Sequence, residues 1–360
     1  MMKSNFLYLI LFAFGLANVA SAQMGKIDTS HISDKSFCVV RLDVKRILSQ
    51  VKNPKKILKT FAEELRRDAK IDFFSINCMT FQFGDTDIWD GAPSFALTME
   101  FAKDIDQESI IETVSRGADY REVTQNGKKY LKPETEDEPY FYFQSKRKFT
   151  LATPGAIKAI LVSGGGMGDI ASRIKSTPPG SEFLAVFQKT EKFEDSVTDV
   201  YREFGALVNV LDLEQLLEKA HTGLAFMNLT SGKPLYLQLT VDSEQSAESL
   251  KTDLKSLMTL GKSSLPAAKA LLKMEMKKLN DAGLGEKGDQ LSNAGKWALG
   301  VGLYSLDLAE KILAAATCQT KGKMVWVEVK HMGGLKEIAD LAASGLALLF
   351  NERFQDGEEE

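Results

Sequence analysis

Histidine and cysteine are scarce in this chain, with three residues of each among 360. Histidine is the side chain that most often serves as a base or a metal ligand near neutral pH, and a zinc site needs about four converging ligands. His31, His221 and His331 each lack a second histidine or a cysteine at metal-ligand spacing. The sequence therefore predicts no catalytic histidine, no metal site and no cofactor.

Three cysteines are too few for a disulfide scaffold in a chain of this length. Cys38 and Cys78 both fall in predicted strands of the first half, so they form the candidate pair if one disulfide is present. The alternative, which we favour, is that these two and Cys318 are small buried hydrophobic side chains.

Recognisable catalytic motifs are also missing. The chain has no Gly-x-Ser-x-Gly nucleophile elbow. Its glycine run, 164–166, follows a predicted helix and lacks the Gly-Lys-Ser/Thr end of a phosphate loop, so it indicates a linker. The acidic stretch 134–138 lies between two prolines and lacks EF-hand spacing, which is typical of a solvated loop. No catalytic residue is predicted.

A strong excess of one charge and a long apolar run are absent from the mature region. The formal net charge is −4, so no nucleic-acid-binding surface is indicated. After residue 22 no segment reaches the ~18 uninterrupted apolar residues of a membrane span. We therefore expect no stable span beyond the N-terminal segment.

The N-terminus has the pattern of a secretory signal peptide. Lys3 precedes an apolar run, and the small residues Ala20 and Ala22 flank one position directly before Gln23. This order of a positive start, an apolar region and a small-residue site predicts cleavage after Ala22. The alternative is an uncleaved N-terminal anchor. We expect an exported protein, periplasmic or secreted.

The rest of the chain alternates between strand and helix patterns. Phe95, Leu97, Met99 and Phe101 recur at every second position, which predicts a strand with one face on a core. Asn126-Gly127 joins two such strands as a tight hairpin turn. Short connections of this kind favour antiparallel pairing. The predicted class is α+β, with largely antiparallel sheets covered by helices.

The second half of the chain resembles the first in its spacing. The predicted strand starts Phe37 and Phe183, and the predicted helix caps Thr153 and Ser305, recur at an offset of about 145–150 residues. This recurrence predicts two tandem, duplicated α+β modules. The predicted organisation is a signal peptide, a flexible mature N-terminus, a first module, a Gly/Pro-rich linker, a second module and an acidic tail, at 1–22, 23–36, 37–162, 163–181, 182–350 and 351–360.

One predicted strand is a candidate binding surface. Tyr140 and Tyr142 alternate with two phenylalanines, and Lys146 and Arg147 follow in a basic turn. An exposed aromatic face beside cations can bind a glycan, a peptide or an anionic polymer. The alternative, which we favour, is that one face of this strand is core and the other is covered.

In overall style the chain resembles large exported bacterial proteins of unknown function that are built from repeated strand-helix modules. The resemblance is carried by the signal-like N-terminus and the repeated units, and it implies export but no functional residue. The leading hypothesis is a non-catalytic binding or scaffold protein of the cell envelope, whose partner is a protein or a glycan. The alternatives are an envelope hydrolase with dispersed carboxylates and a self-associating structural protein.

Overall fold

The computed structural model describes residues 27–50, 54–89, 92–115, 118–135, 138–162, 166, 168–177, 180–190, 219–228, 235–281, 303, 306–307 and 309–330. The predicted signal peptide with Ala20, Ala22 and Gln23 and the acidic tail lie outside the described residues.

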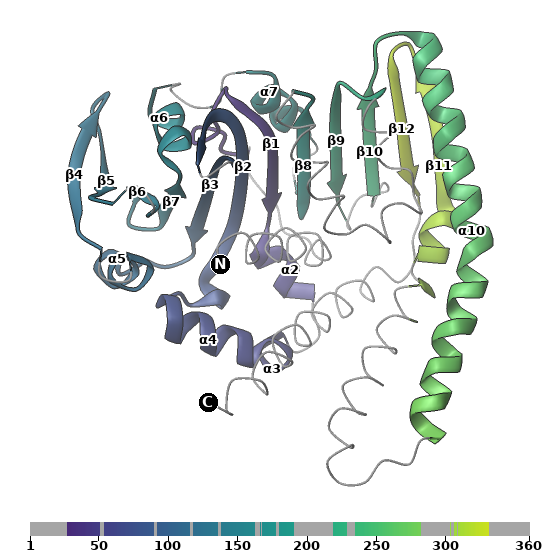
Figure 1. The fold of residues 1–360 in the computed structure, drawn as a ribbon, viewed down its shortest axis with the longest axis horizontal. Coiled ribbons are helices and arrows are strands. Elements are labelled where there is room, and N and C mark those ends of the chain that lie inside the picture. Colours follow the sequence, from purple (N-terminus) through teal and green to yellow (C-terminus); the bar gives the residue numbers. More distant parts are fainter. Residues whose placement is uncertain are drawn as a thin grey trace.

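A single antiparallel sheet of 12 strands runs through the described part of the chain (Figure 1). Along the sheet the order is β11-β12-β10-β9-β8-β1-β2-β3-β7-β6-β5-β4. The strands are β1 (Ser36–Leu42), β2 (Ile76–Trp89), β3 (Ala92–Phe101), β4 (Tyr120–Gln125), β5 (Lys128–Pro133), β6 (Tyr140–Ser145), β7 (Lys148–Ala152), β8 (Phe183–Gln188), β9 (Thr222–Met227), β10 (Leu235–Thr240), β11 (Ala316–Lys321) and β12 (Met324–Val329). A large antiparallel sheet with helices confirms the predicted α+β class.

One face of the sheet, face A, carries most of the helices. They are α2 (Val44–Gln50), α3 (Pro54–Ile57), α4 (Lys59–Ala69), α5 (Gln107–Ser115) and the long α10 (Glu244–Asp281). In the first half, helix residues such as Ile47 and Ile110 share one buried cluster with Phe81 and Phe149 of the sheet. The alternation predicted for β3 supplies Leu97 and Met99 to this core, as expected.

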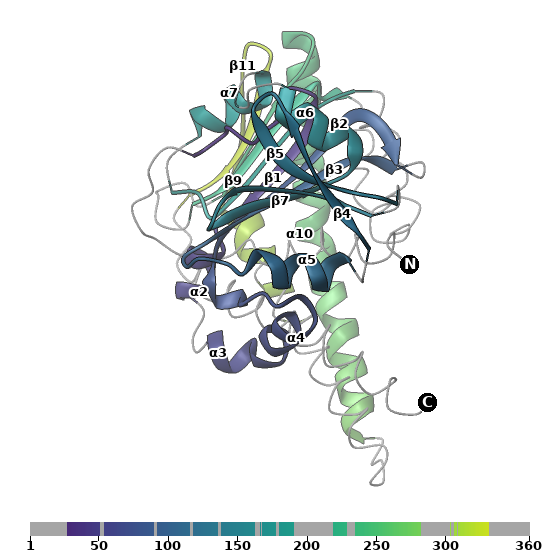
Figure 2. The same cartoon turned by 90° about the vertical axis from the view of Figure 1, so that its left-hand side faces the viewer.

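The opposite face, face B, is covered by α6 (Pro154–Val162) and α7 (Asp169–Ser176). Ile157 and Ile160 of α6 pack against Ala96 and Ala152. Ile170 and Ile174 of α7 belong to a second cluster, which also contains Val39 of β1 and Leu184 of β8. Figure 2 shows α6 and α7 on one side of the strands and α2 to α5 on the other. Each face of the central strands therefore has its own apolar cover.

The mature N-terminus, predicted to be flexible over 23–36, is packed in its described part. Thr29, His31, Ile32 and Ser33 are all at most 6% exposed. The amide of Gln82 on β2 holds this segment, since it donates to the His31 carbonyl (2.9 Å) and accepts from the Ser33 backbone N–H (3.0 Å). Residues 27–35 therefore lie on the sheet, because a buried glutamine satisfies their backbone groups.

The linker predicted for 163–181 is also more ordered than expected. It contains α7, whose Ile170, Ala171 and Ile174 are buried. After α7 the chain enters β8, which pairs antiparallel with β1 at Val39↔Val186 and Val40↔Ala185. The two predicted modules therefore share one continuous sheet, because β1 and β8 pair directly.

The candidate disulfide between Cys38 and Cys78 is excluded by strand register. Cys38 lies opposite Phe83 on β2, whereas Cys78 lies five positions further along that strand. Five residues of strand span roughly 16 Å, far beyond the ~7 Å between Cα atoms that a disulfide tolerates. All three cysteines carry free thiols, and burial raises the pKa of the Cys38 thiol to about 12.

Leu303 is helical. Residues 309–315 are also helical and lead directly into β11. The 309–315 helix packs on α10, since Leu313 lies close to Gly261. Across the residues that the structure describes, no helix combines the length and the apolar character needed to cross a membrane.

Strand order in the two halves follows the same path. The first half runs β1-β2-β3-β7-β6 across the sheet and the second runs β8-β9-β10-β12-β11. In both, the third strand is followed by a helix on face A, which is α5 in the first half and α10 in the second. The first half adds a hairpin, β4–β5, outside β6, and no described strand of the second half corresponds to it. The outer edge of β11 therefore corresponds to the edge of β6 that β5 covers.

Candidate functional site

The four residues of the predicted aromatic surface do not form one exposed patch. Tyr140 is 6% exposed, lies in the cluster under α6, and stacks on Tyr130 with ring centroids 6.1 Å apart. Tyr142 is half-buried beside it, and burial raises the pKa of its phenol. Lys146 and Arg147 are exposed in the β6–β7 turn, where Arg147 Nε lies 2.7 Å from Asp104 Oδ1. Because α6 covers Tyr140, the tyrosines contribute mainly to packing.

Face B carries a buried row of polar side chains across the central strands. The strand register places Arg41, Thr80, Thr98, Thr150 and Tyr142 on neighbouring positions of β1, β2, β3, β7 and β6. All of these except Tyr142 are buried. The hydroxyls of Thr98 and Thr150 lie 2.7 Å apart, which satisfies two polar groups that would otherwise be costly to bury.

A cluster of titratable side chains lies on the same face, at Lys148 of β7. Lys148 Nζ lies 2.5 Å from Asp28 Oδ2 and 3.3 Å from His31 Nδ1. Because the ammonium donates to Nδ1, the imidazole is neutral and its proton sits on Nε2. Burial lowers the pKa of His31 to about 3, with the charge of Lys148 acting in the same direction. Burial opposes ionisation of Asp28, but hydrogen bonds from Lys148 and Ser30 lower its pKa overall.

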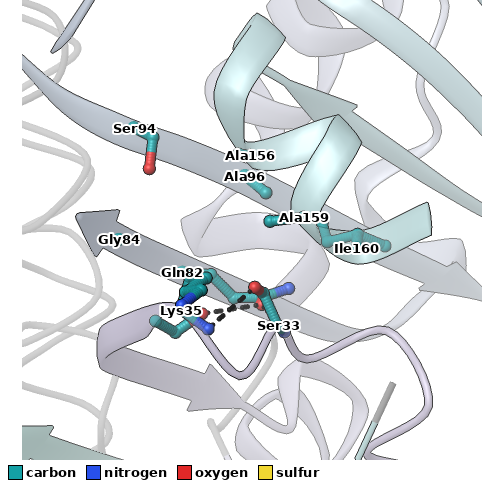
Figure 3. A pocket seen from close by; sticks show the side chains of 10 residues that line it. Ser33, Lys35, Gln82, Gly84, Ser94, Ala96, Ala156, Ala159 and Ile160 are labelled. Carbon is teal, nitrogen blue, oxygen red and sulfur yellow. Dashed lines mark hydrogen bonds between the residues drawn. The ribbon is translucent and has the colours of Figure 1, made fainter. Parts of the chain in front are cut away.

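This cluster ties the N-terminal segment to β7. A small hollow of the described structure lies between α6, β2, β3 and the N-terminal segment (Figure 3). Its cavity volume is about 10 Å³, which is roughly the space that one water molecule needs. Dashed lines there mark the hydrogen bonds that join Ser33 to Gln82 and to Lys35. Small-molecule sites are usually about 300–1,000 Å³.

The described residues also contain no group of three or more histidine, cysteine, aspartate or glutamate side chains that could hold a metal ion.

A different surface lies at the end of the sheet formed by β11. In the described structure β12 is the one strand that pairs with β11. Up to Lys321 the strand reads Ala-Thr-Cys-Gln-Thr, without charge or proline. The opposite end strand, β4, carries exposed Arg121 and Glu122, and Glu122 pairs with Lys129 at 2.8 Å. Charges on an edge strand discourage added strands, so β4 is protected and β11 is open to pairing.

Helix α10 lies on face A beside this edge, and in Figure 1 it continues past the ends of the strands. Leu250 and Leu254 bury its inner side in a cluster with Cys318 and Val325. One flank reaches β11, where Lys251 Nζ lies 3.5 Å from Thr320 Oγ1. The other flank faces inward, since Asp253 pairs with Lys219, three residues before β9, at 2.6 Å. The flank that carries Lys251 therefore borders the open edge.

Four further lysines continue the flank of Lys251. At 100° per residue, Lys255, Lys262, Lys273 and Lys277 lie within the same sector of roughly 80°. All four are exposed, and no described carboxylate lies within ion-pair distance of them. The pKa of Cys318 is raised by burial, and the charges of Lys255 and Lys251 partly offset this rise, so both cations act on β11.

The hairpin between β11 and β12 adds two more exposed cations, Lys321 and Lys323, at its tip. We define the β11 surface as the open edge of β11 together with Lys255, Lys262, Lys321 and Lys323. Sequence reasoning missed this surface, because the strand order that leaves β11 at an edge is not visible in the pattern. The spacing of the α10 lysines was the one available signal.

Comparisons with known proteins add little to this geometry. No family model and no curated protein matches the chain. A solved structure titled "Structure of crystal form I of TP0453" is similar at 9% identity, with 89% of this chain and 98% of that chain covered and a TM-score of 0.40. A likeness at this score carries no argument about function.

Proposed function

We propose that the protein is exported and acts as a non-catalytic binding or scaffold protein of the cell envelope. Export is supported by the N-terminal pattern that ends at Ala20, Ala22 and Gln23. Binding is supported by the β11 surface, which combines a strand edge and cations that have no pairing partner among the described residues. The partner docks at this end of the sheet.

The open edge of β11 is the observation that carries the proposal. Unpaired N–H and C=O groups along an edge strand are a template for another strand. In the first half the corresponding edge, on β6, is paired with β5 at Leu131↔Phe141. The described residues of the second half have the same strand order without such a hairpin, so the end strand β11 is available to a partner.

The proposal includes a duplication of an ancestral module. It is supported by the shared strand order and by the equivalent positions of α5 and α10. Thr153 and Ser305, which the spacing pairs with each other, do not occupy equivalent positions in the two halves. Thr153 follows β7, the last strand of the first half, whereas residue 305 precedes β11. The repeat is longer in the second half, because α10, between β10 and β11, spans 38 residues.

Export predicts a defined mature N-terminus. Mass spectrometry of the protein purified from cells that express the full-length chain should show residue Gln23 as the first residue, because cleavage follows the small residue Ala22. Replacing Ala22 by a bulky residue, Ala22→Phe, should block this cleavage and retain the precursor. An intact Met1 on the purified wild-type protein would contradict the proposal.

Binding at β11 predicts position-specific cross-links. A photo-crosslinking amino acid at Gln319, which is exposed on β11, should capture the partner in intact cells. The matched control is Thr124, which is exposed on the opposite end strand, β4. Cross-links from Gln319 but not from Thr124 are expected, because charged β4 does not accept a strand. No cross-link from either position, or equal yields from both, would refute this placement of the site.

A further inference from the structure

Resting on the proposed function, we infer that the occupant of the β11 surface is an extended, acidic stretch of polypeptide that adds to β11 as an antiparallel strand. Main-chain hydrogen bonds with an edge strand provide affinity in this mode, and alternate side chains provide specificity. The first half shows the geometry, since β5 pairs antiparallel with β6 at the corresponding edge.

The charge of the β11 surface selects the side chains of that strand. Lys255 borders β11 on face A, and Lys262 lies two turns further along α10, beside the 309–315 helix that leads into β11; neither has a carboxylate partner among the described residues. Successive side chains of an added strand point to opposite faces of the sheet. Every second residue of the bound segment therefore faces the flank of α10, where Glu248 and Lys251 pair with each other and Lys255 has no carboxylate partner among the described residues. An acidic residue of the segment beside Lys255 finds complementary charge there.

A second copy of this chain fits the surface poorly. A two-fold pairing of β11 with itself keeps face A of both copies on one side, so each α10 lies beside its partner's α10. The flanks brought together would be those that carry Lys255 and Lys262. Like charges juxtaposed across an interface oppose association. Self-pairing would bring these lysines together, whereas an acidic segment would place carboxylates beside them.

The test uses the mature full-length chain and a labelled decapeptide of alternating Glu and Thr, with fluorescence anisotropy as the readout. One comparison peptide alternates Lys and Thr, and another alternates Glu and Pro. Proline cannot donate to a strand ladder, so the Glu-Pro peptide retains the charge but loses the strand. We expect the Glu-Thr peptide to bind roughly tenfold or more tightly than either comparison peptide.

Charge-reversal variants locate the binding. Lys255→Glu with Lys262→Glu should weaken Glu-Thr binding by about tenfold. Lys103→Glu with Lys146→Glu makes the same charge change at exposed positions near the β6–β7 turn and should leave binding within about twofold. Both pairs are exposed, so circular dichroism should show an unchanged fold.

The outcomes separate this inference from the proposed function. Equal binding of Glu-Thr and Glu-Pro peptides would overturn strand addition in favour of charge attraction alone. No peptide binding, with cross-links from Gln319 still present, would overturn the acidic occupant while leaving the binding site in place. Cross-links from Gln319 that join two copies of this chain would likewise overturn it. Loss of both peptide binding and cross-links would overturn both proposals.

Discussion

Replacing Arg46 with methionine should destabilise the folded protein by about 3–5 kcal/mol, because it leaves two carboxylates buried without their cation. Arg46, Asp43 and Glu182 are 6%, 6% and 0% exposed. Arg46 Nε lies 3.6 Å from Asp43 Oδ2, and Nη1 lies 3.6 Å from Glu182 Oε1. Burial raises the pKa of Asp43, whereas the Arg46 backbone N–H and the charges of Arg41 and Arg46 act against this rise.

The surroundings of Arg46 leave little room for an alternative arrangement. Its guanidinium also donates to the Gly180 carbonyl. Gly180 has φ +93°, and a Cβ there would lie 2.7 Å from Arg46 Nη1, so both the backbone conformation and the close approach require glycine. The Asp43 backbone N–H donates to the Glu182 carbonyl at 2.8 Å. The arginine therefore joins the end of β1 to the start of β8.

Urea unfolding followed by tryptophan fluorescence measures this effect. Lys59→Met is the control, because the Lys59–Glu63 pair is exposed (70% and 63%) and its removal should cost less than about 0.5 kcal/mol. Adding Glu182→Gln to Arg46→Met should recover part of the loss, since one buried charge is then removed. A free energy of unfolding of Arg46→Met within about 1 kcal/mol of the wild-type value would show that water reaches these carboxylates, and would contradict this prediction.

Acidification from pH 6.5 to pH 4 should lower the free energy of unfolding of the wild-type protein by roughly 3 kcal/mol through His31 alone. Burial lowers the pKa of His31 from 6.5 to about 3 in the folded state. Between these two values the unfolded chain binds a proton that the folded chain does not. Stability from this group is therefore complete above pH 6.5 and is lost as the pH falls towards 3.

The His31→Gln variant should show a flatter stability profile between pH 6.5 and pH 4, because glutamine does not titrate. Urea unfolding at a series of pH values provides the measurement. A His31→Gln profile parallel to that of the wild type would show that this imidazole takes up its proton equally in both states.

The sequence patterns located most strands well, because their side chains alternate against one core. The positions Phe95, Leu97, Met99 and Phe101 lie on face A as expected. The same reasoning could not determine which helix covers which strand. Tyr140 reads as half of an exposed aromatic face, and only the position of α6 buries it.

Other differences arise from long-range contacts that a local pattern does not contain. The mature N-terminus is predicted to be flexible because its local sequence contains no packing pattern. In the structure, Gln82 holds residues that precede it by about 50 positions, and such a contact is not visible in a local pattern. Proline usually breaks a helix interior, yet α10 continues through Pro266. Pro266 is exposed, so the backbone groups that proline disturbs can be satisfied by water there.

The place of β1 between β2 and β8 has a consequence for how the chain is made. A ribosome delivers Ser36–Leu42 early, while β8 emerges about 140 residues later, which is a delay of roughly 10–30 s at ordinary rates of synthesis. During that interval one side of a central, hydrophobic strand has no neighbour. Two nascent chains that meet then can exchange this strand, so a domain-swapped dimer is the characteristic misfolding hazard of this topology.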